Sequence, residues 1–218
     1  MLQFANRSAA GNALAEVLAP HLAGPLGERE VVVLGLPRGG VPVAAAVARR
    51  LELPLDVLVV RKVGMPGHAE LALGALGSGG ACYLDHALIS RLGVSADQVA
   101  AVVAAETAEL ARREAAYRAA REPLEVAGRT VLLVDDGLAT GASMRVAALA
   151  VRARAPAAVV AAAPVGPVGV AKRLADVVDE VVLAHTPTPF RAVGAYYADF
   201  SQTSDAEVWA ALRSGEGA

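Results

Sequence analysis

The chain has 218 residues, of which 55% are hydrophobic and 19% are charged, with a formal net charge of -2. This length suits a globular unit with a large core, and the near-neutral charge argues against nucleic acid as the main partner. The single cysteine, Cys82, excludes an internal disulfide and a cysteine-based zinc site. The first residues lack a secretion-signal pattern, and the longest uncharged stretch, 155–171, contains three prolines. We therefore expect a cytoplasmic protein that does not enter a membrane.

Apolar runs of strand length alternate with alanine-rich stretches of helix length along most of the chain. Runs without polar alternation are typical of strands buried on both faces, and helices between them favour parallel pairing. We therefore expect an α/β fold, a doubly wound parallel sheet flanked by helices, with a small cap. The predicted strands are 31–36, 56–60, 130–134, 158–163 and 180–183, and the predicted helices are 8–21 with Ser8 as N-cap, 40–51, 95–121, 141–154 and 205–213.

We expect residues 1–218 to form a single domain with a core, a helical insertion and a C-terminal cap. The expected bounds are about 28–165 for the core, about 86–122 for the insertion and about 166–218 for the cap.

The segment Gly64–Gly80 is rich in glycine and is predicted to be a mobile loop that runs into a hairpin ending near Leu84. The long helix that follows becomes strongly charged toward its end. There, Glu109 and Arg113 have the i, i+4 spacing that supports an exposed helix.

The most informative segment is Val131–Ser143, which reads VLLVDDGLATGAS. A buried strand ends in two acidic residues, and a glycine-rich turn with a hydroxyl group leads into a helix. Such a turn directs several backbone N–H groups and a helix N-terminus at one point, which suits a phosphate. Asp135 and Asp136 would repel a phosphate, but carboxylates accept hydrogen bonds from a sugar diol. The alternative is that the two acids only cap the turn.

This thirteen-residue segment resembles the motif with which type I phosphoribosyltransferases bind phosphoribosyl diphosphate (PRPP). Gly137 is the one departure, because a larger apolar residue or serine is usual there. The resemblance implies that the two aspartates bind the ribose hydroxyls and that Ala139–Ser143 binds the 5-phosphate. The PRPP-binding residues implied in this segment are Asp135, Asp136, Gly137, Leu138, Ala139, Thr140, Gly141, Ala142 and Ser143.

Arg38, Gly39 and Gly40 follow the first predicted sheet strand, where the family has its pyrophosphate loop. Glycines let the backbone approach a ligand closely, and an arginine can bind phosphate oxygens in a bidentate manner. The alternative is a plain strand-to-helix turn with a solvated arginine. The segment matches neither a Walker loop nor G-x-G-x-x-G, which disfavours a nucleotide-sugar or dinucleotide enzyme.

Arg61 and Lys62 end the next predicted strand, at the mouth of the glycine-rich loop. The resemblance implies that this loop closes over the diphosphate and that Arg61, Lys62 and Arg38 are catalytic cations that neutralise the leaving group. Alternatively, Lys62 is an ordinary solvated lysine. Glu70, in the same loop, is a weaker candidate that could equally only balance local charge.

The resemblance implies a phosphoribosyltransferase that uses PRPP and Mg²⁺, modifies a nitrogen acceptor such as a nucleobase, and releases pyrophosphate. Direct protein ligands to the metal are not expected: PRPP would carry the Mg²⁺, and water-mediated contacts to Asp135 and Asp136 stay open. Ala139 stands where 6-oxopurine enzymes of the family have an aspartate, as in adenine-type members, so this loop supplies no general base.

The acceptor and the partners are less determined. The aromatic residues near the C-terminus either stack on a planar acceptor or form the core of the cap. A PRPP-binding regulator on the same scaffold, without transferase activity, is the alternative function, and a homodimer stays open. The aromatic residues concerned are Phe190, Tyr196, Tyr197 and Phe200.

Overall fold

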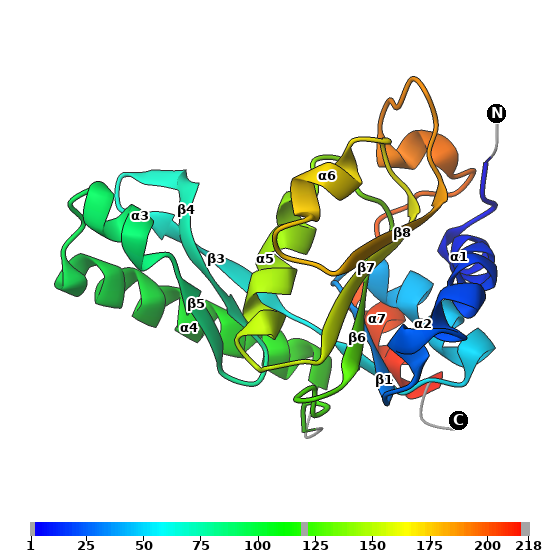
Figure 1. The fold of residues 1–218 in the computed structure, drawn as a ribbon, viewed down its shortest axis with the longest axis horizontal. Coiled ribbons are helices and arrows are strands. Elements are labelled where there is room, and N and C mark those ends of the chain that lie inside the picture. The colour runs from blue at the N-terminus through cyan, green and yellow to red at the C-terminus, as the bar shows by residue number, and fades with distance from the viewer. Residues whose placement is uncertain (1–2, 119–121, 215–218) are drawn as a thin grey trace.

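A computed structural model describes residues 3–118 and 122–214. Within these residues, five parallel strands form the central sheet in the order β2-β1-β6-β7-β8 (Figure 1). The order reverses between β1 and β6, so the expected doubly wound parallel sheet is confirmed. The strands are β1 Val31–Gly35, β2 Leu55–Val57, β6 Thr130–Val134, β7 Ala158–Val165 and β8 Glu180–His185.

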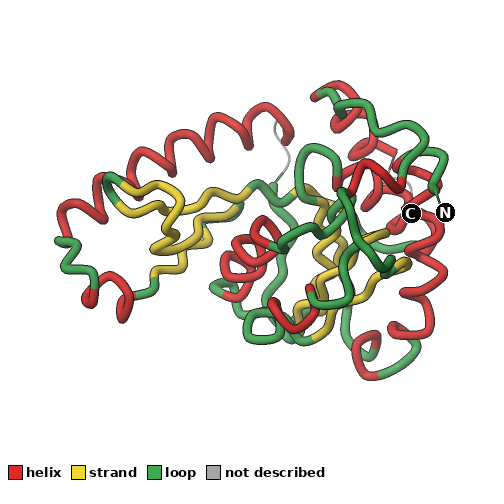
Figure 2. Tube along the Cα trace, turned by 90° about the horizontal axis from the view of Figure 1, so that it is seen from above, coloured by secondary structure: helices red, strands yellow, loops and turns green. Residues whose placement is uncertain are grey.

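Helices cover both faces of this sheet (Figures 1 and 2). Alternate residues of each strand point to opposite faces of the sheet. In β1, Val33 packs in the core with α1, α2 and α7, whereas Val32 packs in the core with α5 and α6. This is why the strands read as continuous apolar runs. The helices are α1 Arg7–Leu22, α2 Gly40–Leu51, α5 Ala142–Arg152, α6 Val170–Leu174 and α7 Asp205–Ser214.

A lobe projects from the parallel sheet, to the left in Figure 1. In the described residues it holds an antiparallel sheet of three strands and two helices. Its elements are β3 Val60–Met65, β4 His68–Gly77, β5 Ala81–Leu84, α3 His86–Arg91 and α4 Ala96–Arg118.

The lobe corrects the prediction of a mobile loop over Gly64–Gly80, because this segment forms the end of β3 and the whole of β4. Two of its glycines are required by the geometry of the antiparallel sheet. Gly67 has a φ of 77° in the turn between β3 and β4, and a Cβ on Gly74 would collide with the backbone of Tyr83 in β5. The predicted strand 56–60 is likewise divided, because Val60 already belongs to the antiparallel sheet.

Two helix boundaries also differ from the prediction. The N-cap of α1 is Asn6, not Ser8, because the Asn6 side chain accepts a hydrogen bond from the Ala9 N–H at 2.9 Å. Helix α4 is the predicted long helix, but residues 119–121 of that prediction lie outside the described residues. Across the described ranges, none of the helices combines the length and the apolar character needed to span a membrane.

A short 3₁₀ turn, η1, occurs at Pro25–Gly27. A second, η2, occurs at Val193–Tyr196, in the C-terminal segment 186–204 between β8 and α7. Tyr196 is 1% exposed and Tyr197 is 3% exposed, and the Phe190 ring stacks on Tyr196 at 5.7 Å between centroids. The tail is tied to the start of the chain, since the Phe4 N–H donates to the carbonyl of Tyr196. These contacts favour the packing role of the aromatic residues over stacking on an acceptor.

Candidate functional site

The two predicted ligand loops meet at one edge of the parallel sheet. Strands β1 and β6 are neighbours, with Gly35 paired to Val134, so the loops that follow them lie side by side. A Cβ on Gly40 would lie 2.8 Å from the Cα of Asp135, so a larger residue there would push the loops apart. Carboxyl ends of parallel strands at such a reversal of strand order are where α/β sheets bind ligands.

A cavity of about 450 Å³ opens between this edge and the lobe. On the sheet side it is lined by Arg38, Asp135 and Ser143, and on the lobe side by residues from the end of α4, including Tyr117. Its volume lies in the range of roughly 300–1,000 Å³ that is typical of small-molecule sites.

The predicted phosphate turn forms a smaller adjoining hollow of about 140 Å³, lined by residues 137–144 together with Asp135. Gly141, with a φ of 84°, is the N-cap of α5, so the first backbone N–H groups of that helix face the hollow. Arg173 of α6 donates hydrogen bonds to the carbonyls of Ala139 and Thr140 at 3.0 and 3.1 Å. Sequence reasoning missed Arg173, which fixes the turn and adds positive charge beside it.

The two acidic residues have different surroundings. Asp135 lines both hollows, and its Oδ1 accepts a hydrogen bond from the Asp136 N–H at 2.9 Å. The carboxylate of Asp136 is instead held by Arg7 of α1, with Nε at 2.9 Å and Nη2 at 2.8 Å. Gly39 packs against this pair, because a Cβ there would collide with the Asp136 carboxylate. The geometry therefore presents Asp135 to a ligand, while Asp136 anchors α1.

Electrostatics distinguish the pair further. Although Asp135 lines the cavity, it lies deep, and burial raises its pKa to about 8, with the neighbouring Asp136 charge adding to the effect. Burial also raises the pKa of Asp136, but the Arg7 guanidinium opposes this shift. Burial therefore favours the protonated form of Asp135 before a ligand binds. A strongly shifted carboxyl group in a cavity is typical of a functional site.

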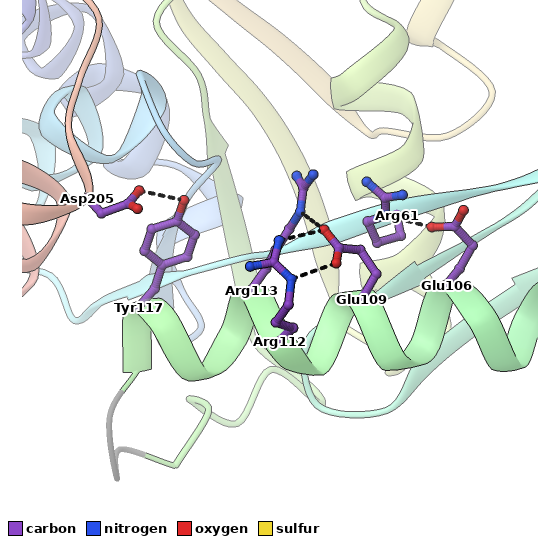
Figure 3. A network of polar contacts seen from close by, with 7 residues as sticks. All are labelled: Arg61, Glu106, Glu109, Arg112, Arg113, Tyr117 and Asp205. Carbon is purple, nitrogen blue, oxygen red and sulfur yellow. Dashed lines mark hydrogen bonds and ion pairs between the residues drawn. The ribbon is translucent and has the colours of Figure 1, made fainter.

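Arg61 and Lys62 lie in β3, not in a loop after a parallel strand, and they line a separate cavity of about 360 Å³. Arg61 forms an ion pair with Glu106 of α4, with 2.6 Å between Nε and Oε2 (Figure 3). The structure therefore does not bring these two cations to the cavity of Arg38 and Asp135. The side chain of Glu70 lies outside what the structure describes.

Comparison with known proteins decides the family. A family model described as phosphoribosyl transferase domain matches residues 3–188. The chain belongs to the phosphoribosyltransferase family, type I.

Two relatives resemble this chain along nearly all of its sequence. The crystal structure of TT1426 from Thermus thermophilus is 44% identical, covers 97% of this chain and 98% of that one, and superposes with a TM-score of 0.86. A presumed phosphoribosyl transferase of Mycobacterium tuberculosis is 45% identical over 212 residues, which make up 97% of this chain and 47% of the relative. The chain thus spans about half the length of the curated relatives that it matches.

Cations from α4 complete the cavity. Arg112 and Arg113 line it opposite Asp135, and Arg38 lies on the sheet side with its Nη1 3.9 Å from Asp205 Oδ1. The i, i+4 spacing of Glu109 and Arg113 predicted an exposed helix face for Arg113. In the sequence, only the charged end of the helix indicated that these arginines could bind a ligand. Their position at the cavity depends on how the end of α4 packs against α7.

The residues that the structure describes contain no cluster of three His, Cys, Asp or Glu side chains that could enclose a metal ion. Asp135 and Asp205 are carboxyl groups at the cavity that could contact a cation carried by a phosphorylated ligand.

Proposed function

We propose that this phosphoribosyltransferase binds PRPP together with Mg²⁺ and transfers the 5-phosphoribosyl group to a nitrogen acceptor, such as a nucleobase, with release of pyrophosphate. The observation that supports this most strongly is the convergence of the phosphate turn, Asp135 and Arg38 on adjoining hollows. These groups follow the order of phosphate, ribose and diphosphate along PRPP.

Each group suits one part of the substrate. The N-terminus of α5 and the backbone N–H groups of Ala139–Ser143 would bind the 5-phosphate. Asp135 would hydrogen-bond a ribose hydroxyl. Arg38, at the start of α2, would hydrogen-bond the diphosphate.

In the reaction, the acceptor nitrogen forms a bond to C1 of the ribose, and the bond from C1 to the diphosphate oxygen breaks. The diphosphate leaves with that electron pair, so negative charge develops on it in the transition state. Preorganised cations around the leaving group stabilise that charge. Mg²⁺ bound with PRPP would supply further neutralisation of the diphosphate.

The phosphate turn places no titratable side chain at residue 139, since Ala139 is exposed and carries only a methyl group. The turn therefore supplies no general base for the acceptor. We propose that the acceptor, like those of adenine-type enzymes, needs no general base from this turn.

The test is isothermal titration of the protein with PRPP and Mg²⁺, followed by a pyrophosphate-release screen over purine, pyrimidine and pyridine acceptors. We expect PRPP binding and release with at least one acceptor class, and both should be lost in Asp135→Asn. Binding of PRPP without release for any acceptor would instead identify a PRPP-binding regulator. A protein that does not bind PRPP contradicts both functions.

A further inference from the structure

Helix α4 gives the cavity a wall with two adjacent arginines, Arg112 and Arg113. This helix belongs to the lobe, so these cations approach the site from the side opposite Asp135 and the phosphate turn. Their position differs from that of Arg61, whose side chain is held within the lobe by Glu106.

Glu109 orients both arginines. Its carboxylate accepts hydrogen bonds from Arg112 through Nε at 2.7 Å and Nη2 at 2.9 Å, and from Arg113 through Nε at 2.8 Å. These two arginines lower the pKa of Glu109 to about 2, so it stays ionised across the physiological range. Because Glu109 contacts Arg113 through Nε, the terminal nitrogens of Arg113 point away from α4 (Figure 3).

The helix that carries these arginines is fastened on both sides of them. Before them, Glu106 pairs with Arg61 of β3. After them, the Tyr117 hydroxyl donates to Asp205 Oδ1 at 3.1 Å, and the indole N–H of Trp209 in α7 donates to the Ala116 carbonyl. Cations held in place before a ligand arrives stabilise developing charge without reorganising at the moment of reaction.

The charges around the cavity fit a multiply charged anion. Arg112, Arg113 and Arg38 supply three guanidinium groups, each with several donors that match phosphate oxygens. The facing carboxylates offset part of this charge, because Glu109 accepts from Arg112 and Arg113, and Asp205 Oδ1 lies 3.9 Å from Arg38 Nη1. Burial favours the neutral form of Asp135. A diphosphate carries more negative charge and more acceptor oxygens than a single phosphate, so it suits a site with three arginines.

We propose that Arg112 and Arg113 bind the diphosphate of PRPP from the lobe side, the role that the family resemblance assigned to Arg61 and Lys62. This inference rests on the proposed function. It makes the lobe a part of the PRPP site, with α4 in the position that sequence reasoning gave to a mobile loop.

The test measures binding of magnesium pyrophosphate, PRPP and ribose 5-phosphate by isothermal titration. In the double variant Arg112→Gln/Arg113→Gln, affinity for pyrophosphate and PRPP should fall about tenfold to a hundredfold, as expected for lost charge-assisted hydrogen bonds. Affinity for ribose 5-phosphate should be unchanged, because that ligand has no diphosphate. Arg129→Gln is the matched control, since Arg129 pairs with Glu30 at 2.9 Å at the opposite end of β6.

Each outcome has one meaning. Equal pyrophosphate and PRPP affinity in the wild type and the double variant overturns the inference and leaves the proposed function standing. An equal loss in Arg129→Gln also overturns it, because the effect would then be one of net charge. A wild-type protein that binds neither PRPP nor ribose 5-phosphate contradicts the proposed function itself. If the glutamine variant does not fold, Arg112→Lys/Arg113→Lys, which keeps the charge but not the guanidinium geometry, should show a smaller loss of the same pattern.

Discussion

Val193 of the C-terminal segment occupies the space beside Gly137 in the phosphate turn: a Cβ on Gly137 would come within 3.0 Å of both Val193 methyl groups. Gly137 is the position at which this chain departs from the family motif. The departure is explained by packing, because the glycine makes room for a residue of the tail. The backbone at Gly137 is not in the left-handed region, so a side chain would be resisted by Val193 and not by its own φ.

The first prediction concerns this contact. Gly137→Ala should destabilise the protein by about 1 to 3 kcal/mol, the usual cost of overpacking a filled space. Val193→Ala in the same chain should restore most of that loss, because it removes the two methyl groups that collide. Thermal unfolding of the four proteins of the double-mutant cycle measures the coupling. Strictly additive effects would show that the two residues do not compete for space.

The second prediction concerns Arg7 and Asp136, whose side chains are only 12% and 16% exposed. Arg7→Met should lower the free energy of unfolding by about 3 kcal/mol, because the Asp136 carboxylate would stay buried without its partner. Arg7→Met/Asp136→Asn should recover much of this. Arg129→Met is the comparison, because its partner Glu30 is 75% exposed and the pair should contribute about 1 kcal/mol or less. Denaturant titration gives the values, and similar losses in the two single variants would refute the anchoring role.

The third prediction concerns pH. Burial raises the pKa of Asp135 from 3.8 to about 8, so the folded protein binds more protons than the unfolded chain between these values. Stability should therefore fall as the pH rises through this window and level off above it. Asp135→Asn is neutral throughout and should lose this dependence, so it should be more stable than the wild type at about pH 9 and closer to it at about pH 5. Melting temperatures at both pH values decide the matter, and parallel pH profiles would argue against the shift.

The fourth prediction separates Arg61 from the site. Its ion pair with Glu106 is about one-quarter exposed, at 27% and 25%, so Arg61→Gln should cost about 1 kcal/mol or less in stability. Pyrophosphate affinity should stay close to that of the wild type. A loss as large as that of the Arg112 and Arg113 variants would mean that Arg61 turns to the ligand when it binds, as the family resemblance implied.

Much of the fold follows from local pattern. The inner parallel strands β1, β6 and β7 are buried on both faces, so runs such as Val131–Val134 have no polar interruption and are visible in the sequence. The hairpin predicted to end near Leu84 is confirmed by β4 and β5, whereas the predicted loop before it is wrong, because glycine occurs both in turns and in strands. Gly67 does form a turn, but Gly74 lies within a strand, where it allows close approach to Tyr83. Sequence pattern alone does not separate these uses.

The site was predictable where its residues are consecutive. The segment Asp135–Ser143 forms its hollow from one strand, one turn and one helix start, all encoded locally. Contacts between distant elements had no such signal. Arg7 reaches Asp136 across 129 positions, and Arg113 reaches the cavity because the end of α4 packs against α7. The i, i+4 pair with Glu109 was visible in the sequence, but the direction in which that helix face points was not.

The family model ends at residue 188, yet Val193, Tyr197, Asp205 and Trp209 all contact the site or the helix that walls it. This has a consequence for the timing of synthesis. While the chain is being translated, the phosphate turn is made long before α7, so the sheet can assemble while the lobe still lacks the helix to which α4 is fastened. A ribosome-bound chain that stops at residue 188 contains all the residues that the family model matches. Its cavity wall is set only after residue 209 has emerged.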